Sequence, residues 1–372
     1  MLNKFYQLVA ALYAGGYRIL AVFLVGALAT PEASANYAKF FFWAGLICSV
    51  TGVPIAARAQ VKDNPLSHYQ QAILFLAFSA LFGAVAFFFW NGSLLHFGIT
   101  LIAGALLSVF EINRMERAAE GKFALLTLCS IISLALLFLA IFYSAELGNW
   151  LIVPVFAGLA SPVLLSYFII PHKVTASITL TQATKPVSAN AFSSLIVTGM
   201  TFIVPILLIE EFGDQYSTLL AQIYSVAALA FAYPRYVATG FIVAAKQGKA
   251  TINDVKSLTR NITLFAIFSC VVFCAVTWLL APQMLQFTLL FVAMQLSQVT
   301  VPYANWWTSH GKEFSVMLLN FASLLVLSVA VAGAYMVLPQ GEWRGQVILI
   351  CFVAYQLLRF ILYSRFEHYR SN

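Results

Sequence analysis

Long apolar runs, separated by short polar segments, recur along the whole chain. Twelve of these runs are long enough to cross a hydrocarbon layer of about 30 Å as helices, which takes about 20 residues. They cover residues 5–28, 37–57, 70–90, 94–112, 123–143, 150–170, 188–209, 217–244, 261–281, 283–303, 314–337 and 346–364. The sequence does not show the alternating segments of about ten residues that are typical of barrel strands. The pattern therefore predicts an all-α polytopic membrane protein with twelve transmembrane helices.

Composition agrees with this prediction. Of the 372 residues, 62% are hydrophobic and 9% are charged, whereas a soluble domain carries about 25% charge. The five cysteines all lie in apolar runs, where cysteine acts as a small hydrophobe. No metal, nucleotide or nucleophile motif is present in the sequence, so we expect no cofactor and no enzymatic activity. The net charge of +7 is explained by basic loops, and we expect no nucleic-acid partner.

The distribution of positive charge predicts the orientation of the chain. Fifteen of the 20 Lys and Arg residues fall at loops on the side of the N-terminus, while only Lys39 and Arg344 fall at loops on the other side. Loops that face the cytoplasm collect Lys and Arg. We therefore expect a multi-pass protein of the bacterial inner membrane with both termini in the cytoplasm.

Landmarks that recur along the chain indicate an internal duplication. Lys4 precedes the first span and Lys185 precedes the seventh, and Pro54 and Pro234 follow these lysines at nearly equal distances, 50 and 49 positions. An even number of spans gives two parallel copies, related by an axis along the membrane normal. We expect two pseudo-symmetric six-helix bundles around a central cavity: residues 1–171, a cytoplasmic linker at 172–187, and residues 188–372.

Three arginines lie inside the predicted spans. Arg359 is close to the predicted end of the last span, so its side chain is expected to extend to the interface. Arg18 and Arg235 lie deeper, roughly 20 Å and 15 Å from the inner ends at 1.5 Å per residue. An arginine at the centre of a membrane helix costs about 2.5–3.5 kcal/mol, so both should face a hydrated cavity or a partner. Pro234, beside Arg235, is expected to kink the helix and open the bundle.

Two interpretations of these arginines remain open. Glu111, the only acid within a predicted span, can form a structural ion pair with Arg18, Arg114 or Arg117. Alternatively, Arg18 and Arg235 meet in a cavity that binds an anion, since guanidinium matches the geometry of phosphate. The remaining candidate substrate-binding residues are polar side chains within the spans, each of which is also a plausible helix–helix contact: Tyr233, Tyr236, Asn190, Gln222, Asn320 and Gln356.

Several stretches resemble a known transporter superfamily. They are YRILAVFLVGALATPEASANYAKFFFWAGL, YPRYVATGF, and the endings GKF and GKEF of the fourth and tenth spans. With the turn Thr30-Pro31-Glu32, they resemble the multidrug/oligosaccharidyl-lipid/polysaccharide (MOP) exporters, and within these the O-antigen and polysaccharide flippases. The chain departs from the family in being short and in lacking an acid on the seventh span before Glu210.

The resemblance implies alternating-access transport of an undecaprenyl-pyrophosphate-linked oligosaccharide, with Arg18 and Arg235 holding the pyrophosphate. Outward movement of a negative charge is favoured by about 2.3 kcal/mol per 100 mV, and this would need no ATP site. Expected partners are the lipid-linked substrate, membrane lipids and polysaccharide-assembly proteins. The alternatives are a cation-coupled efflux antiporter, which would need acids in its cavity, and a membrane polysaccharide polymerase or ligase, which would need a large outer loop.

Overall fold

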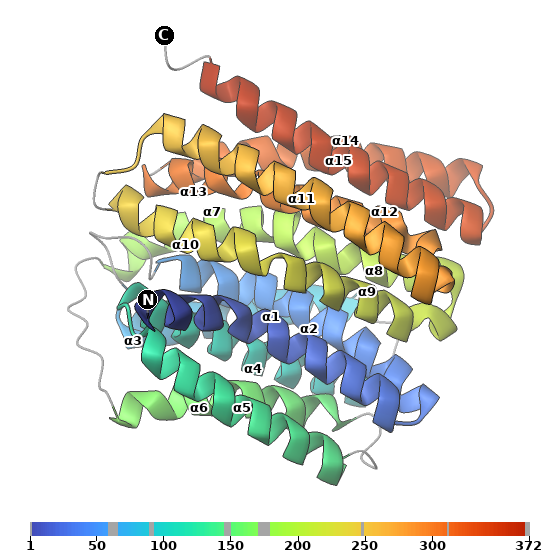
Figure 1. Cartoon of the computed structure of the whole chain (residues 1–372), viewed down its shortest axis with the longest axis horizontal. Coiled ribbons are helices and arrows are strands. Elements are labelled where there is room, and N and C mark those ends of the chain that lie inside the picture. Colours follow the sequence, from blue (N-terminus) through green and yellow to red (C-terminus); the bar gives the residue numbers. More distant parts are fainter. Residues whose placement is uncertain are drawn as a thin grey trace. The chain divides into compact units, whose positions relative to one another are not determined.

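The computed structural model describes residues 2–58, 66–88, 93–144, 150–169, 179–246, 249–310 and 312–368. All regular structure in these ranges is helical (Figure 1). The α-helices are α1 (Leu2–Leu28), α2 (Pro31–Arg58), α3 (His68–Phe88), α4 (Leu94–Ala119), α5 (Phe123–Ser144), α6 (Ile152–Ile169), α7 (Leu180–Ser194), α8 (Met200–Phe212), α9 (Ser217–Ala230), α10 (Ala232–Lys246), α11 (Ile252–Leu280), α12 (Thr288–Val299), α13 (Val301–Ser309), α14 (Glu313–Val337) and α15 (Glu342–His368).

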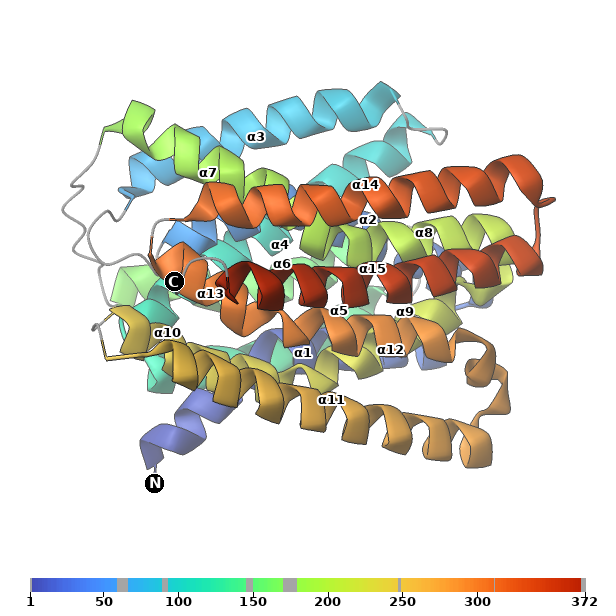
Figure 2. The same cartoon turned by 90° about the horizontal axis from the view of Figure 1, so that it is seen from above.

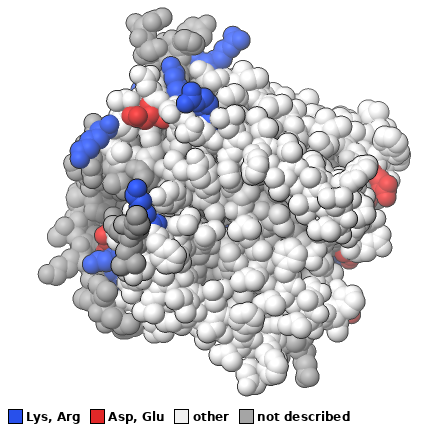
Figure 3. All heavy atoms as spheres, viewed as in Figure 1, with Lys and Arg blue, Asp and Glu red and all other residues white. Residues whose placement is uncertain are grey.

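The helices confirm an all-α polytopic membrane protein. Within the described residues, nine helical stretches are long and apolar enough to cross a membrane, and a bent pair in α1 raises the number to ten. Each of the twelve predicted spans has a helical counterpart. On the face drawn in Figure 3, residues other than Lys, Arg, Asp and Glu make up most of the surface, as expected where lipid tails are the solvent.

Several helices extend beyond their predicted bounds. The predicted linker at 172–187 is helical from Leu180 onward, and residues 170–178 lie outside the described part. Thr179 and Gln182 form a capping box at the start of α7, as Thr251 and Asp254 do for α11. In a capping box each side chain bonds the other residue's backbone N–H, which satisfies two donors at the helix start. Polar helix ends of this kind do not contribute to a hydropathy pattern.

Two predicted spans are each divided into two helices ahead of a proline. The span at 217–244 is α9 and α10, separated at Phe231, and the span at 283–303 contains α12 and α13, separated at Thr300. Pro234 and Pro302 therefore lie in the first turn of the following helix, where a missing backbone N–H breaks no helical bond. The interruption at Phe231 lies three residues ahead of Pro234, within a stretch that still runs as one candidate span from Asp214 to Ala238.

The chain separates into two compact units, Met1–Ile203 and Val204–Asn372, so the division falls within α8. The predicted division lay at the linker 172–187, which includes the first half of α7. The two differ because α7 and the π-helical turn that follows it (Leu195–Gly199) pack against α2 in the first unit. The first unit also has α4 packed between α2 and α6, and α5 packed against α1 and α6.

Close backbone approach joins α2 to α4. A Cβ added to Gly52 would lie 2.6 Å from the Cα of Ser108, and one added to Gly104 would lie 2.6 Å from Ile47. The Thr51 hydroxyl is 2.7 Å from the Ser108 hydroxyl at the same contact. Small residues at such an interface let two helices approach and gain packing and hydrogen bonds without a hydrophobic driving force.

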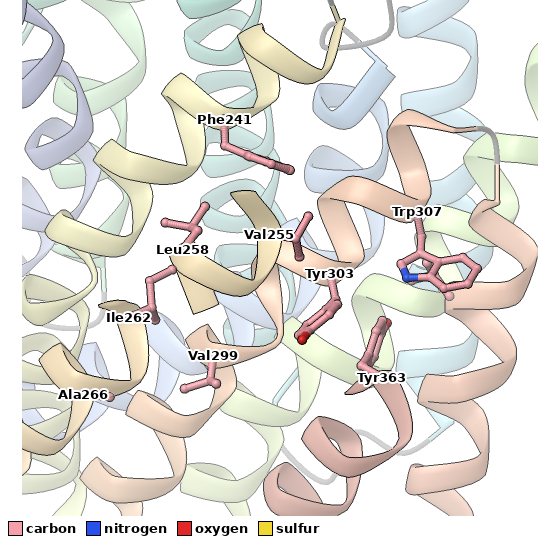
Figure 4. Close-up of a cluster of buried hydrophobic side chains, with 10 residues drawn as sticks. Phe241, Val255, Leu258, Ile262, Ala266, Val299, Tyr303, Trp307 and Tyr363 are labelled. Atoms are coloured by element: carbon pink, nitrogen blue, oxygen red, sulfur yellow. The ribbon is translucent and has the colours of Figure 1, made fainter. Parts of the chain in front are cut away.

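The second unit has α15 packed against α12 and α14, with α11 along α12 (Figure 2). Its core includes a cluster of buried side chains that reach one another from α10 to α15 (Figure 4). Tyr303, Trp307 and Tyr363 contribute the large rings of this cluster. Tyr363 is fully buried, and its hydroxyl bonds to Asn320 of α14. The cluster therefore borders a group of buried polar side chains.

Candidate functional site

The first unit holds a carboxylate between two guanidinium groups. Arg18 Nη2 of α1 donates to Oε1 of Glu111 of α4 at 2.7 Å. Arg114 donates to Oε2 of the same carboxylate through Nη2 at 2.7 Å and through Nε at 3.1 Å. The side chains of Arg18, Glu111 and Arg114 are 11%, 12% and 17% exposed. The group carries a net charge of +1 in a largely buried place.

Two tyrosines of α1 hold Arg18 in this position. Tyr17 donates to the carbonyl of Val155 at 2.5 Å, and the Tyr13 hydroxyl lies 2.6 Å from that of Ser133. These contacts join α1 to α6 and α5. A bend of 44° divides α1 into Lys4–Tyr13 and Gly15–Leu28, and Arg18 lies just after the bend. The ion pair therefore fixes the second segment of α1 to α4.

The structure shows the ion pair that was one of the two sequence interpretations. Arg18 is not available to a ligand in this state, because its Nη2 already donates to Glu111. Its Nε is buried without a partner, so the guanidinium keeps an unused donor. The predicted proximity of Arg18 and Arg235 stays a prediction, since Arg235 lies on α10 and its side chain is outside the described residues.

The first unit holds a second buried acid, which the sequence pattern did not predict. The fourth span was predicted to end at 112, whereas α4 continues to Ala119 and brings Glu116 into the packed unit, where it is 4% exposed. Gln71 and Tyr167 donate hydrogen bonds to its two oxygens, and His68 Nδ1 lies 3.9 Å away. Glu111 is therefore not the only acid within the helical bundle.

Arg117, expected in a basic loop, is also buried within α4. It is 1% exposed, pairs with Glu120 at 2.9 Å and lies over the ring of Tyr167 at 3.9 Å. Its Nε and Nη2 both donate to Ser166 of α6. Arg117 thus joins this end of α4 to α6. A hydropathy pattern does not indicate that this charged residue is buried.

The prediction that Arg359 extends to the interface is wrong. It is 1% exposed, because α15 continues nine residues beyond it to His368. Its guanidinium donates to three neutral oxygens: Gln356 Oε1 at 2.7 Å, Thr300 Oγ1 at 3.0 Å and Asn320 Oδ1 at 3.2 Å. Asn320 and Gln356, two of the predicted substrate-binding residues, are thereby brought together around an arginine that the prediction had set aside.

The other predicted residues belong to neither cluster. Tyr233 is 37% exposed and packs its ring against Phe265 at 4.8 Å. Tyr236 and Gln222 lie half-buried on α10 and α9 of the second unit, and Asn190 lies half-buried on α7 of the first. The role of these residues in substrate binding stays a prediction.

Comparison with known proteins shows the fold. No protein-family model and no curated protein sequence matches the chain. Solved structures do match over nearly the whole chain. A mutant of the Vibrio cholerae MATE transporter VcmN has a TM-score of 0.62 at 12% identity, covering 99% of this chain and 96% of that one.

Two further matches are the inward-facing and outward-facing conformations of a multidrug resistance MATE family transporter of the MOP superfamily. Their TM-scores are 0.55 and 0.58, with identities of 14% and 13%. They cover 98% and 97% of this chain, and 94% and 93% of the matched chains. The chain therefore has the fold of a MATE-type transporter of the MOP superfamily. The narrower resemblance to polysaccharide flippases has no such support.

Proposed function

We propose that this protein is a secondary transporter that exports its substrate by alternating access, coupled to the entry of a cation. The observation that carries the proposal is the likeness of nearly the whole chain to multidrug MATE transporters captured facing inward and facing outward. From the sequence, cation-coupled efflux had less support than lipid-linked oligosaccharide transport, because an efflux antiporter needs acids within the bundle and only Glu111 lay within a predicted span. Glu116 adds a second such acid to Glu111.

The geometry of Glu111 suggests how cation entry is coupled to movement. Each carboxylate oxygen binds one arginine. A proton that binds Oε1 removes the acceptor of Arg18, because a protonated carboxyl no longer carries the charge that holds the guanidinium. Arg114 keeps its two bonds to Oε2. Protonation therefore releases the second segment of α1 from α4 while the tyrosine contacts keep α1 on α5 and α6.

Transport in proteoliposomes tests this proposal. With a pH gradient imposed, the wild-type protein should move a fluorescent organic cation against its gradient, and the movement should cease when the pH gradient is collapsed. Glu111→Gln should remove coupling, because the amide cannot take up and release a proton at neutral pH. Glu342→Gln is the matched control, since Glu342 is exposed at the start of α15. Gradient-independent movement in the wild type, or full coupling in Glu111→Gln, contradicts the proposal.

A second candidate substrate is an anionic lipid-linked oligosaccharide, and the charge balance favours it. Arg18 and Arg114 share one carboxylate, and Arg359 pairs with none among the described residues. An organic cation would meet this excess of positive charge unfavourably, whereas a pyrophosphate would not.

The test of this candidate is the amount of polysaccharide at the surface of cells that depend on this protein. Arg18→Ala and Arg235→Ala should each lower it, with Arg18→Lys and Arg235→Lys giving smaller losses. Unchanged polysaccharide in both Ala variants removes these two residues from lipid-linked substrate transport and leaves the cation-coupled efflux reading.

A further inference from the structure

Arg359 is a buried charge without a counter-charge in the described chain. Its three bonds run to an amide oxygen of Gln356, an amide oxygen of Asn320 and the hydroxyl of Thr300. The ring of Tyr355 lies 5.7 Å from its guanidinium carbon. No carboxylate of the described residues forms an ion pair with it. Burial of an unpaired charge is strongly unfavourable unless a partner of opposite sign accompanies it.

The cluster also has more donors than acceptors. A guanidinium carries five N–H donors, and the bonds to Gln356, Asn320 and Thr300, with the hydroxyl of Tyr363 as a further neighbour, do not use all of them. Asn320 Oδ1 already accepts from both Arg359 and Tyr363. The Thr300 hydroxyl gives its own proton to the carbonyl of Ser297. The acceptors of this group are therefore engaged, while donors remain.

Gln356 gives an independent indication of a ligand. Its side chain is fully buried, and its Nε2 has no hydrogen-bond partner. The amide cannot be turned to satisfy this group, because its NH2 would then face the guanidinium, donor against donor. The unpaired NH2 of Gln356 and the unused N–H donors of Arg359 lie close together, because the two side chains are already joined by a hydrogen bond of 2.7 Å between Arg359 Nη1 and Gln356 Oε1. A buried orphan donor costs about 1–3 kcal/mol.

We propose that Arg359, Gln356 and Asn320 form the binding site of a small monovalent anion of the chloride class, within the second unit. One guanidinium with no carboxylate carries a single positive charge, so a monovalent anion neutralises it and a dianion leaves a buried negative charge. The anion accepts from the unused donors of Arg359 and Gln356. A water molecule would accept the same hydrogen bonds but would leave the charge unbalanced. The site goes beyond the proposed transport function and does not depend on which substrate is exported.

The anion would balance the charge of the arginine that joins α15 to α14 and to the junction of α12 and α13. Thr300 lies at the junction of α12 and α13, Asn320 lies on α14, and Arg359 and Gln356 lie on α15. Anything that binds the folded state and not the unfolded one stabilises the folded state, and the stabilisation grows with ligand concentration. We therefore expect the thermal stability of the whole protein to depend on chloride.

The test uses the purified full chain in nanodiscs, with chloride replaced stepwise by gluconate at constant ionic strength. The melting temperature should rise with chloride and saturate. Arg359→Gln should abolish the rise. Gln356→Glu is the sharper variant, because it keeps the acceptor, removes the orphan donor and supplies a counter-charge. It should abolish the chloride dependence and melt above the wild type in chloride-free buffer. Gln346→Glu, the same change on α15 at a residue that donates to Gln286, is the matched control and should keep the dependence.

A structure determined in bromide, with its anomalous signal, locates the anion directly, and bromide should lie within hydrogen-bond distance of Arg359. Three results overturn the proposal: no chloride-specific change in the wild type, a chloride response that survives in Gln356→Glu, or water at the bromide position. Stabilisation by inorganic phosphate in place of chloride also overturns it, since that outcome assigns the site to a divalent ligand. If Arg359→Gln does not fold, Gln356→Glu and the bromide experiment still decide.

Discussion

Loss of Glu111 should destabilise the first unit more than loss of either arginine that it binds. In Glu111→Met, the guanidiniums of Arg18 and Arg114 both lose their counter-charge. Removing one partner of a buried ion pair costs about 3–5 kcal/mol. The three side chains retain 11–17% exposure, so we place the loss of unfolding free energy at the lower end, about 3 kcal/mol. In Arg18→Met the carboxylate keeps both bonds to Arg114, and we expect a loss of about 1.5 kcal/mol, the value of one charged hydrogen bond.

The double variant Arg18→Met/Glu111→Met separates this reasoning from simple loss of packing. With the carboxylate gone, Arg18 is an uncompensated cation, so its removal should restore stability rather than cost more. The double variant should be at least as stable as Glu111→Met alone. The assay is unfolding in mixed micelles of non-ionic detergent and dodecyl sulfate, followed by tryptophan fluorescence. Exposed Glu342→Met serves as the control and should change little. Losses that add up to about 4.5 kcal/mol by simple addition would refute the shared-carboxylate account.

Two further predictions concern packing and capping. Gly52→Ala should lower stability by about 1–3 kcal/mol through a clash with the backbone of Ser108, while Gly98→Ala, which meets nothing within 4 Å on α4, should be neutral or slightly stabilising; equal effects of the two in a thermal melt would exclude close approach as the cause. Thr251→Ala should cost about 1 kcal/mol by removing the cap of α11 that it shares with Asp254, and unchanged melting would show that the cap contributes nothing to the folded protein.

The positions of the membrane helices along the chain could be predicted because lipid imposes one dominant constraint. A segment that crosses the hydrocarbon layer must be apolar along its whole length and must satisfy its backbone internally. Helix ends could not be predicted in the same way. The starts of α7 and α11 are polar, and they are set by capping boxes at Thr179 and Thr251, which lie outside any apolar window. The breaks at Phe231 and Thr300 had a local signal in the prolines that follow them, Pro234 and Pro302.

The charged residues of the bundle show a different limit. The helical position of Arg18 and its pairing with Glu111 could be predicted, because both residues interrupt an apolar run. Arg117 and Glu116 did not stand out, since they lie in a stretch dense in charge that is typical of a loop. Their burial depends on α3 and α6 packing against the end of α4, through Gln71 and Tyr167. These contacts join residues that are 45 and 51 positions apart in the sequence. A periodic hydropathy pattern cannot indicate contacts between such distant segments.

Arg359 shows both limits, because neither the end of its helix nor the burial of its side chain could be predicted from the sequence. Its surroundings also differ from those of the buried arginine in the first unit. Its depth was underestimated because the last span was predicted to end at 364, whereas α15 continues to His368. In the first unit, a carboxylate balances the arginine of α1. In the second, three neutral oxygens surround Arg359 and leave its charge unbalanced within the described chain. The two units thus differ in how they hold a buried arginine: Arg18 is paired with Glu111, a pair that we propose a proton releases, whereas Arg359 has only neutral acceptors, a set that we propose an anion completes.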